Sequence, residues 1–115
     1  MTITVNTKAY TEDSTSPNVV RYAGPSQTVS VTDNIELKRQ APKRTATYDG
    51  NSRTSMRMTR SAVVNGKTLT AYVAEEASIP VGFPDADVTA LQTDAAALFA
   101  SATGQDVVKK ARLRF

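Results

Sequence analysis

Two turn-forming dipeptides enclose a long alternating segment, and they constrain this chain more than any other feature of its sequence. Asp49-Gly50 and Asn65-Gly66 both tolerate the positive φ angles that type I′ turns require. The segment between them, 51–64, contains no proline or glycine and alternates apolar with polar or basic side chains, as a half-buried strand does. The pattern predicts an antiparallel meander of strands at 35–48, 51–64 and 67–79.

Strand register follows from counting outward from the two turns, if each is a two-residue hairpin. Leu37 then lies opposite Ala62, and Ala62 opposite Leu69. Because neighbouring side chains point to opposite sides of a sheet, one side, the apolar face, collects Ile35, Leu37, Ala41, Met56, Met58, Ala62, Val64, Leu69 and Val73. The other side, the polar face, collects Lys38, Gln40, Arg44, Arg53, Ser55, Arg57, Thr59, Ser61, Thr70, Tyr72 and Glu76.

One residue does not fit this division. Arg60 falls on the apolar face opposite Arg39, and like charges placed directly across a pair of strands repel. Two acids of the C-terminal segment, Asp87 and Asp94, are candidates for neutralising them.

The chain before and after the meander completes an α+β plan. Short strands are expected at 2–10 and 18–23 around a polar loop, "TEDSTSP", with a further strand at 28–31. We therefore expect a single domain over 1–115, made of an N-terminal hairpin (1–25), an antiparallel sheet (26–80) and helices (85–115).

Helical spacing begins after Pro80 and Pro84, with Asp85 or Asp87 as the expected cap. Gly104 is expected to end the first helix, and a second, short helix to start near Thr103. The two helices carry an apolar stripe that is large for one small sheet, which favours a dimer in which helices cross between subunits; the alternative is that they cap their own sheet. The residues expected to pack are Val88, Leu91, Leu98, Phe99, Val107 and Val108.

Charge distribution points to a polyanionic partner. The net charge is +3, but between Lys38 and Lys67 one acid, Asp49, stands among many bases. On the polar face, cations can bind phosphates, hydroxyls and Gln40 can contact base edges or 2′-hydroxyls, and Tyr72 can stack on an unpaired base. All residues of that face except Glu76 are therefore candidate ligands of single-stranded RNA; the alternative is an ordinary solvated sheet face.

Other chemistries find little support. The chain has no cysteine and no histidine, which removes disulfides, the usual zinc ligands and an ordinary catalytic triad. Glu75 and Glu76 point to opposite faces of a strand, and no EF-hand spacing follows Asp85. We expect no enzyme activity, cofactor, metal, small-molecule substrate or membrane partner. The basic end "KKARLRF" suits either nucleic acid or a helix C-terminus.

The chain resembles the coat proteins of single-stranded RNA bacteriophages. The resemblance rests on the element order, the two terminal helices, the segment "IELKRQAPKR" (35–44) and the link "SIPVGF" (78–83). The resemblance runs from about Thr28 to Phe115. It implies an N-terminal hairpin, a five-stranded sheet and two helices, with edge-to-edge dimers that form a ten-stranded sheet clasped by helices. It also implies an icosahedral shell, the virion, which is assembled in the bacterial host cytoplasm.

In that family the sheet face away from the helices binds genomic RNA, including an operator hairpin whose binding represses translation. By position, the resemblance makes Lys38, Gln40, Arg57, Thr59, Thr70 and Tyr72 RNA-facing. Thr59, Ser61 and Lys38 offer chemistry similar to an adenine pocket of that family. Two other functions remain open, a monomeric single-stranded nucleic-acid-binding module and a phage tail or virion decoration protein.

Overall fold

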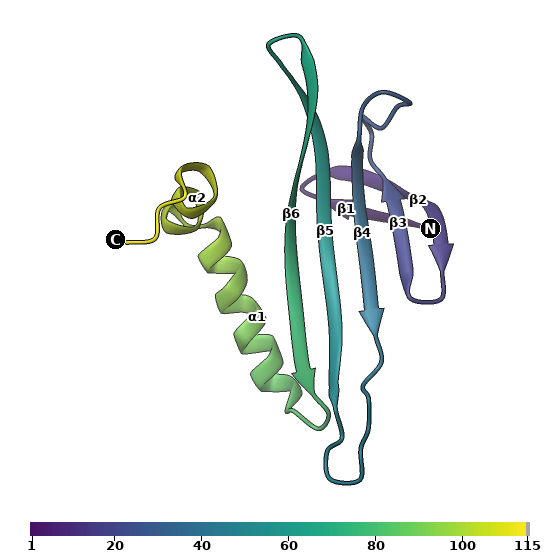
Figure 1. The fold of residues 1–115 in the computed structure, drawn as a ribbon, viewed down its shortest axis with the longest axis vertical. Helices are drawn as coiled ribbons and strands as arrows, with labels where there is room; N and C mark the ends of the chain where they lie inside the picture. The colour runs from purple at the N-terminus through teal and green to yellow at the C-terminus, as the bar shows by residue number, and fades with distance from the viewer. Residues whose placement is uncertain (115) are drawn as a thin grey trace. The chain divides into compact units, whose positions relative to one another are not determined.

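The computed structural model describes residues 1–114, which form two compact units, Met1–Val81 and a second that begins at Gly82. The first unit is one antiparallel sheet in which strands neighbour one another in chain order, β1-β2-β3-β4-β5-β6 (Figure 1). The strands are β1 Thr2–Val5, β2 Lys8–Ser16, β3 Val19–Ala23, β4 Asp33–Gln40, β5 Asn51–Val64 and β6 Lys67–Pro80. The helices of the second unit are α1 Asp85–Ala100 and α2 Ala102–Lys110. The α+β class, the antiparallel meander and the two C-terminal helices are thus confirmed.

The strand expected at 18–23 is confirmed as β3, but the other early elements differ from the expectation. Residues 2–10 are split by a tight turn at Asn6 and Thr7, whose φ angles are 50° and 66°. The polar segment expected to be a loop is instead most of β2, and 28–31 forms no strand. Polarity misled the assignment because β2 has Tyr10 as its one buried residue, so its other side chains face solvent on both sides.

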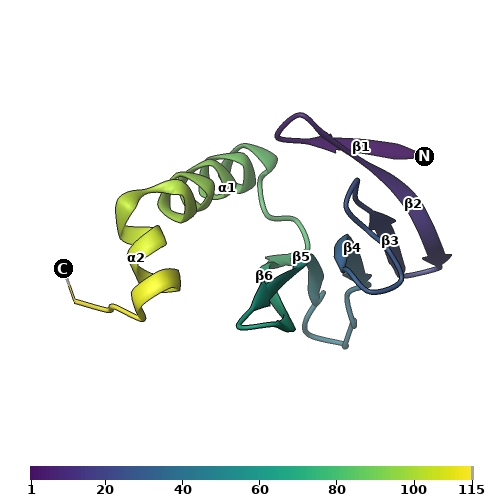
Figure 2. The same ribbon diagram turned by 90° about the horizontal axis from the view of Figure 1, so that it is seen from above.

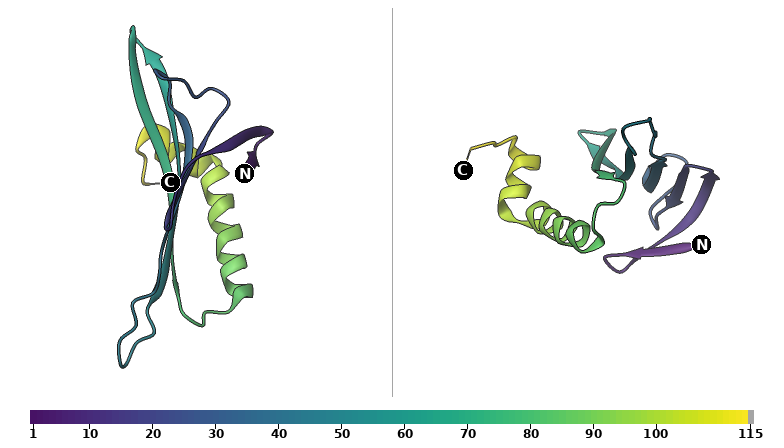
Figure 3. Two further views of the ribbon diagram at one scale, coloured as in Figure 1. Left: turned by 90° about the vertical axis from the view of Figure 1, so that its right-hand side faces the viewer. Right: turned by 90° about the horizontal axis from the view of Figure 1, so that it is seen from below.

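The core of the sheet unit lies on the apolar face, over the strands β2, β3 and β4. Tyr10, Tyr22 and Ile35 are buried there. Figures 2 and 3 show β1 and β2 bending out of the plane of the later strands, which brings the N-terminal hairpin over this face. Four partly buried side chains pack against the cluster: Ile3, Val20, Leu37 and Met58.

The β5–β6 hairpin has the register that the sequence predicted. Val64 pairs with Lys67, and the pairing continues without a shift to Asn51 opposite Pro80. Asn65 and Gly66 form the turn with φ angles of 52° and 77°, the left-handed values that an Asn-Gly turn supplies.

The β4–β5 register differs from the prediction. Leu37 pairs with Met56 rather than Ala62, a displacement of six positions along β5. The connection is not a two-residue turn: residues 41–50 form a loop whose tip is closed by the Thr45 N–H donating to the Tyr48 carbonyl, at 2.8 Å. Since six is an even number, the side chains of β4 and β5 keep their predicted faces even though they have different partners. Ala41, predicted on the apolar face, lies in the loop instead.

The expected clash of two arginines is absent for the same reason. Arg60 lies opposite Asp33, with 3.5 Å between Nε and Oδ1, and it donates to the Tyr10 hydroxyl at 2.8 Å. That hydrogen bond is the largest cause of a raised pKa for Arg60. Arg39 instead pairs with Thr54 and donates to the Pro17 carbonyl at 2.9 Å. Asp33, an acid of the sheet, therefore neutralises Arg60.

The helical unit turns sharply between its two helices at Ser101 (Figure 1). Ser101 ends α1 and also caps α2, accepting a hydrogen bond from the Gly104 N–H at 3.2 Å. Gly104 lies inside α2, where a Cβ would meet the Leu98 carbonyl oxygen at 2.2 Å. The expected caps were wrong: Pro84 precedes α1 without a side-chain cap, and Asp85 and Asp87 occupy its first turn, where carboxylates favour the helix dipole.

Among residues 1–114, neither helix combines the length and apolar character needed to cross a membrane. The same residues contain no cluster of three or more potential metal ligands of the His, Cys, Asp or Glu type.

Candidate functional site

The polar face of β4, β5 and β6 brings together all the predicted RNA ligands except Arg44. Ladder pairs place Lys38 beside Ser55, Gln40 beside Arg53, and Thr59 beside Tyr72. Ser61 and Thr70 complete the set, with 3.2 Å between their hydroxyl oxygens. The strands therefore hold a continuous surface of cations, hydroxyls and amides on one side of the sheet.

Arg57 and Tyr72 form a contact at the centre of this face. The Arg57 guanidinium carbon lies 4.4 Å from the centroid of the Tyr72 ring, within cation–π range. The contact runs diagonally between strands, since Arg57 pairs with Ala74 and Tyr72 with Thr59. Tyr72 remains 62% exposed. A cation is thus held over an aromatic ring that is still accessible to a partner.

Glu36 is an acid on the polar face that the sequence reasoning did not single out. Its Oε2 lies 2.8 Å from Arg21, and its Oε1 lies 3.4 Å from the Lys38 ammonium. The hydrogen bond from Arg21 is the largest cause of a lowered pKa for Glu36, against the opposing effect of burial. Spacing gave a usable signal, because Glu36 and Lys38 are two apart on one strand and so share a face. Lys38 is therefore ion-paired with Glu36, and Arg57 lies directly opposite Glu36 in the β4–β5 ladder.

Arg44 is not on the sheet. It belongs to the loop 41–50, so its predicted position beside Ser55 was wrong; Ser55 pairs with Lys38 and Glu76. The error follows from the β4–β5 register, because β4 ends at Gln40 instead of continuing to the Asp-Gly dipeptide.

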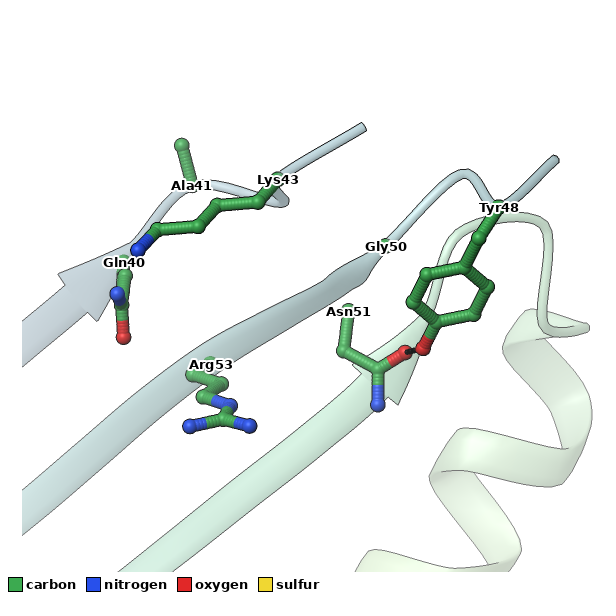
Figure 4. A pocket seen from close by; sticks show the side chains of 7 residues that line it. All are labelled: Gln40, Ala41, Lys43, Tyr48, Gly50, Asn51 and Arg53. Atoms are coloured by element: carbon green, nitrogen blue, oxygen red, sulfur yellow. Dashed lines mark hydrogen bonds between the residues drawn. The ribbon is translucent and has the colours of Figure 1, made fainter. Parts of the chain in front are cut away.

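The same loop creates a depression of about 230 Å³ beside the first residues of β5 (Figure 4). The Tyr48 hydroxyl hydrogen-bonds to Asn51 Oδ1, and Asn51 Nδ2 donates to the Ser78 hydroxyl at 3.0 Å. Sequence reasoning placed Tyr48 at the end of a strand and did not identify this site. The lining residues are Gln40, Ala41, Lys43, Tyr48, Gly50, Asn51 and Arg53.

Large apolar side chains on both units are exposed. On the apolar face, Leu69 and Val73 of β6 are about half exposed. None of the residues of α1 or α2 is buried. Of the six predicted packing residues, five are exposed, including Phe99 at 46%, and Val88 is partly buried. Apolar side chains exposed in groups on one surface often mark a site that binds a partner.

No known protein family matches the sequence, and no curated protein does so either. Solved structures, by contrast, match along almost the whole chain. A chain from the virus-like particle of Beihai levi-like virus 32 superposes with a TM-score of 0.84 at 13% identity, covering 96% of this chain and 91% of that one.

Two further particles give the same result. For the virus-like particle of bacteriophage AVE019, the TM-score is 0.77 at 19% identity, with coverage of 100% and 96%. For that of bacteriophage GQ-907, the TM-score is 0.79 at 15% identity, with coverage of 93% and 84%. At such identities the likeness concerns the fold. The chain has the fold found in these virus-like particles of a levi-like virus and two bacteriophages, and the fold that the sequence resemblance implied is thus confirmed.

Proposed function

We propose that this chain is the coat subunit of a small single-stranded RNA phage, a structural protein whose copies pair and then build an icosahedral shell. The observation that carries the proposal is the fold, shared over nearly the full chain with proteins from virus-like particles of a levi-like virus and a bacteriophage. As one coat-protein domain over residues 1–115, the chain would reside in the virion and assemble in the cytoplasm of the bacterial host.

Dimerisation through β6 is supported by the order of the sheet. β6 is the last strand, and its outer edge has no strand partner among residues 1–114. It is also long, with 14 residues. An unpaired edge of this length exposes a row of backbone donors and acceptors that favour pairing with another chain. Two copies pairing β6 with β6 would form an isologous, closed contact.

Helix packing across the dimer would cover the remaining apolar surface. Leu91, Leu98 and Phe99 of α1 are all about half exposed within this chain. Leu69 and Val73 of β6 need a cover of the same character. Burying both sets between two subunits removes apolar area from water, at about 25 cal/mol for each Å².

RNA binding on the polar face is the second part of the proposal. Arg53 and Arg57 supply phosphate affinity, and Tyr72 supplies a stacking ring already beside a guanidinium. Ser55, Thr59, Ser61 and Thr70 add hydroxyls that can contact bases or 2′-hydroxyls. The bound RNA is the genome. The proposal includes specific binding of one RNA hairpin that acts as a translational operator.

Electron microscopy and size-exclusion chromatography of the purified protein test the proposal together. A coat subunit should elute as very large particles that contain nuclease-protected RNA and appear as closed shells. Elution at the mass of a monomer or dimer, with bound RNA, would instead support a nucleic-acid-binding module that forms no capsid.

A further inference from the structure

A depression between the loop 41–50 and the polar face has a composition that suits one nucleotide. Its lining side chains include two cations, one aromatic ring and two amides, and no acid: Lys43, Arg53, Tyr48, Gln40 and Asn51. Cations bind phosphate, a ring stacks on a base, and amides can donate to and accept from base edges. Its volume of about 230 Å³ is below the roughly 300–1,000 Å³ of pockets that hold drug-sized ligands. One unit of a polymer fits this description better than a cofactor.

Tyr48 is fixed in place before any ligand arrives. Its hydroxyl hydrogen-bonds to Asn51 of β5 (Figure 4). Asn51 in turn donates to Ser78 of β6, so the phenol is linked to two strands. The residue nevertheless stays 55% exposed. A ring that is already oriented and still accessible loses little conformational entropy when a base stacks on it.

The loop backbone that positions these groups is also constrained. Gly50 has a φ of +86°, and a Cβ there would meet the Lys43 carbonyl oxygen at 2.6 Å. The Gly50 carbonyl accepts from the Val81 N–H at 3.1 Å, which fastens the loop to the end of β6. Glycine is needed because the Lys43 segment passes directly over its Cα.

The site is separate from the stack at Tyr72. Tyr72 pairs with Thr59, which is eight residues along β5 from Asn51. At about 3.3 Å per residue, that spacing amounts to roughly 26 Å. One nucleotide cannot reach both rings.

We propose that this depression is a second nucleotide site, which binds one unpaired nucleotide of single-stranded RNA with its base on Tyr48 and its phosphate on Lys43 and Arg53. The inference rests on the proposed RNA-binding function and adds a position at the loop end of the sheet. An RNA strand lying along β5 would thus be held at two separated stacking points, Tyr72 and Tyr48.

Binding of a fluorescently labelled single-stranded hexaribonucleotide to the full chain tests this site. Tyr48→Leu should weaken binding about 5- to 150-fold, the loss expected for one base–ring stack. Tyr48→Phe keeps the ring and loses the contact with Asn51, so its loss should be smaller. Arg53→Gln should lower the salt dependence of binding by about one counterion. Because Tyr48 and Arg53 are exposed, the far-ultraviolet circular dichroism of all three variants should match that of the wild type.

Photocrosslinking locates the base directly. A hexaribonucleotide that carries one 4-thiouridine should crosslink to Tyr48 and, in Tyr72→Leu, should still do so. If Tyr48→Leu binds and crosslinks like the wild type while Arg57→Ala binds more weakly, the second site is wrong and RNA binding on the face stands. If the wild type binds no RNA, both proposals fail. If Tyr48→Leu alone weakens binding, the second site stands and the role of the sheet centre fails.

Discussion

At the N-terminal end of the apolar face, Tyr22 and Ile35 are buried against Tyr10, whereas on β6 Leu69 and Val73 remain about half exposed. The two ends share one sheet and one alternating pattern. They differ in their cover: the N-terminal hairpin folds back over the first, and within residues 1–81 nothing comparable covers the second. An apolar face in the sequence therefore predicts that its side chains are buried, but it does not tell whether the same chain or a partner covers them. Here the uncovered end coincides with β6, one of the two edge strands of the sheet among residues 1–114.

The largest effect should come from the covered end. Ile35→Ala removes a side chain that is 5% exposed and should lower the free energy of unfolding of the subunit by about 2–5 kcal/mol. Urea denaturation under conditions that dissociate any assembly measures it. Leu69→Ala is the matched control, because Leu69 is 54% exposed and its loss should change subunit stability by about 0.5 kcal/mol or less. Equal losses in the two variants would end the comparison.

Removing an exposed apolar side chain should weaken assembly more than it lowers the stability of the subunit. Phe99→Ala removes apolar area that we propose is buried between subunits, so it should weaken association by about 2–5 kcal/mol and leave the isolated subunit nearly unchanged. Analytical ultracentrifugation and thermal melting of the particles would measure the effect. Gln92→Ala, a polar position on the same helix, serves as the control. Particles of Phe99→Ala with wild-type thermal stability would show that this end of the chain needs no partner.

Removing a charge from the polar face should change neither the stability of the subunit nor its association. Arg57→Ala should weaken RNA binding and reduce the slope of log affinity against log salt by about one, since one phosphate contact is lost. Filter binding across a salt series measures the slope. Lys67→Ala removes a cation from the rim of the apolar face and should leave the slope unchanged. Identical slopes for Arg57→Ala and the wild type would contradict the assignment of the RNA surface.

The smallest effect is expected from Glu36 and depends on pH. Its pKa in the folded chain lies below the ordinary value of 4.5 because Arg21 and Lys38 favour the carboxylate. The ionised form thus stabilises the fold above about pH 4.5, and this contribution is lost as the pH falls through the lowered pKa. Glu36→Gln should be less stable than the wild type at pH 7 and should lose less stability between pH 5 and pH 3.

Urea denaturation midpoints at pH 7 and pH 3 would measure this difference. Glu76→Gln, at an exposed position of the same face, is the matched control. A wild type and a Glu36→Gln variant with parallel pH profiles would show that the Glu36 ion pairs contribute nothing to the fold.

Local sequence determined the parts of this fold that depend on neighbouring residues. Asn65-Gly66 specified a two-residue turn, and that turn alone fixed the β5–β6 register from Val64–Lys67 to Asn51–Pro80. Alternation then assigned Arg57 and Tyr72 to one face and Met58 to the other. Helical spacing located α1 and α2, although not their caps, because caps depend on the backbone conformation of one or two residues.

Tertiary structure decided what the local pattern left open. A period of two is unchanged when a strand slides by an even number of residues, so alternation could not distinguish Met56 from Ala62 as the partner of Leu37. That choice follows from long-range contacts: Arg60 meets Asp33 and Tyr10 only in the observed register. The same choice releases residues 41–50 from the strand and forms the depression at Tyr48. The sequence thus determined the two faces, and packing between distant segments determined the partners across them.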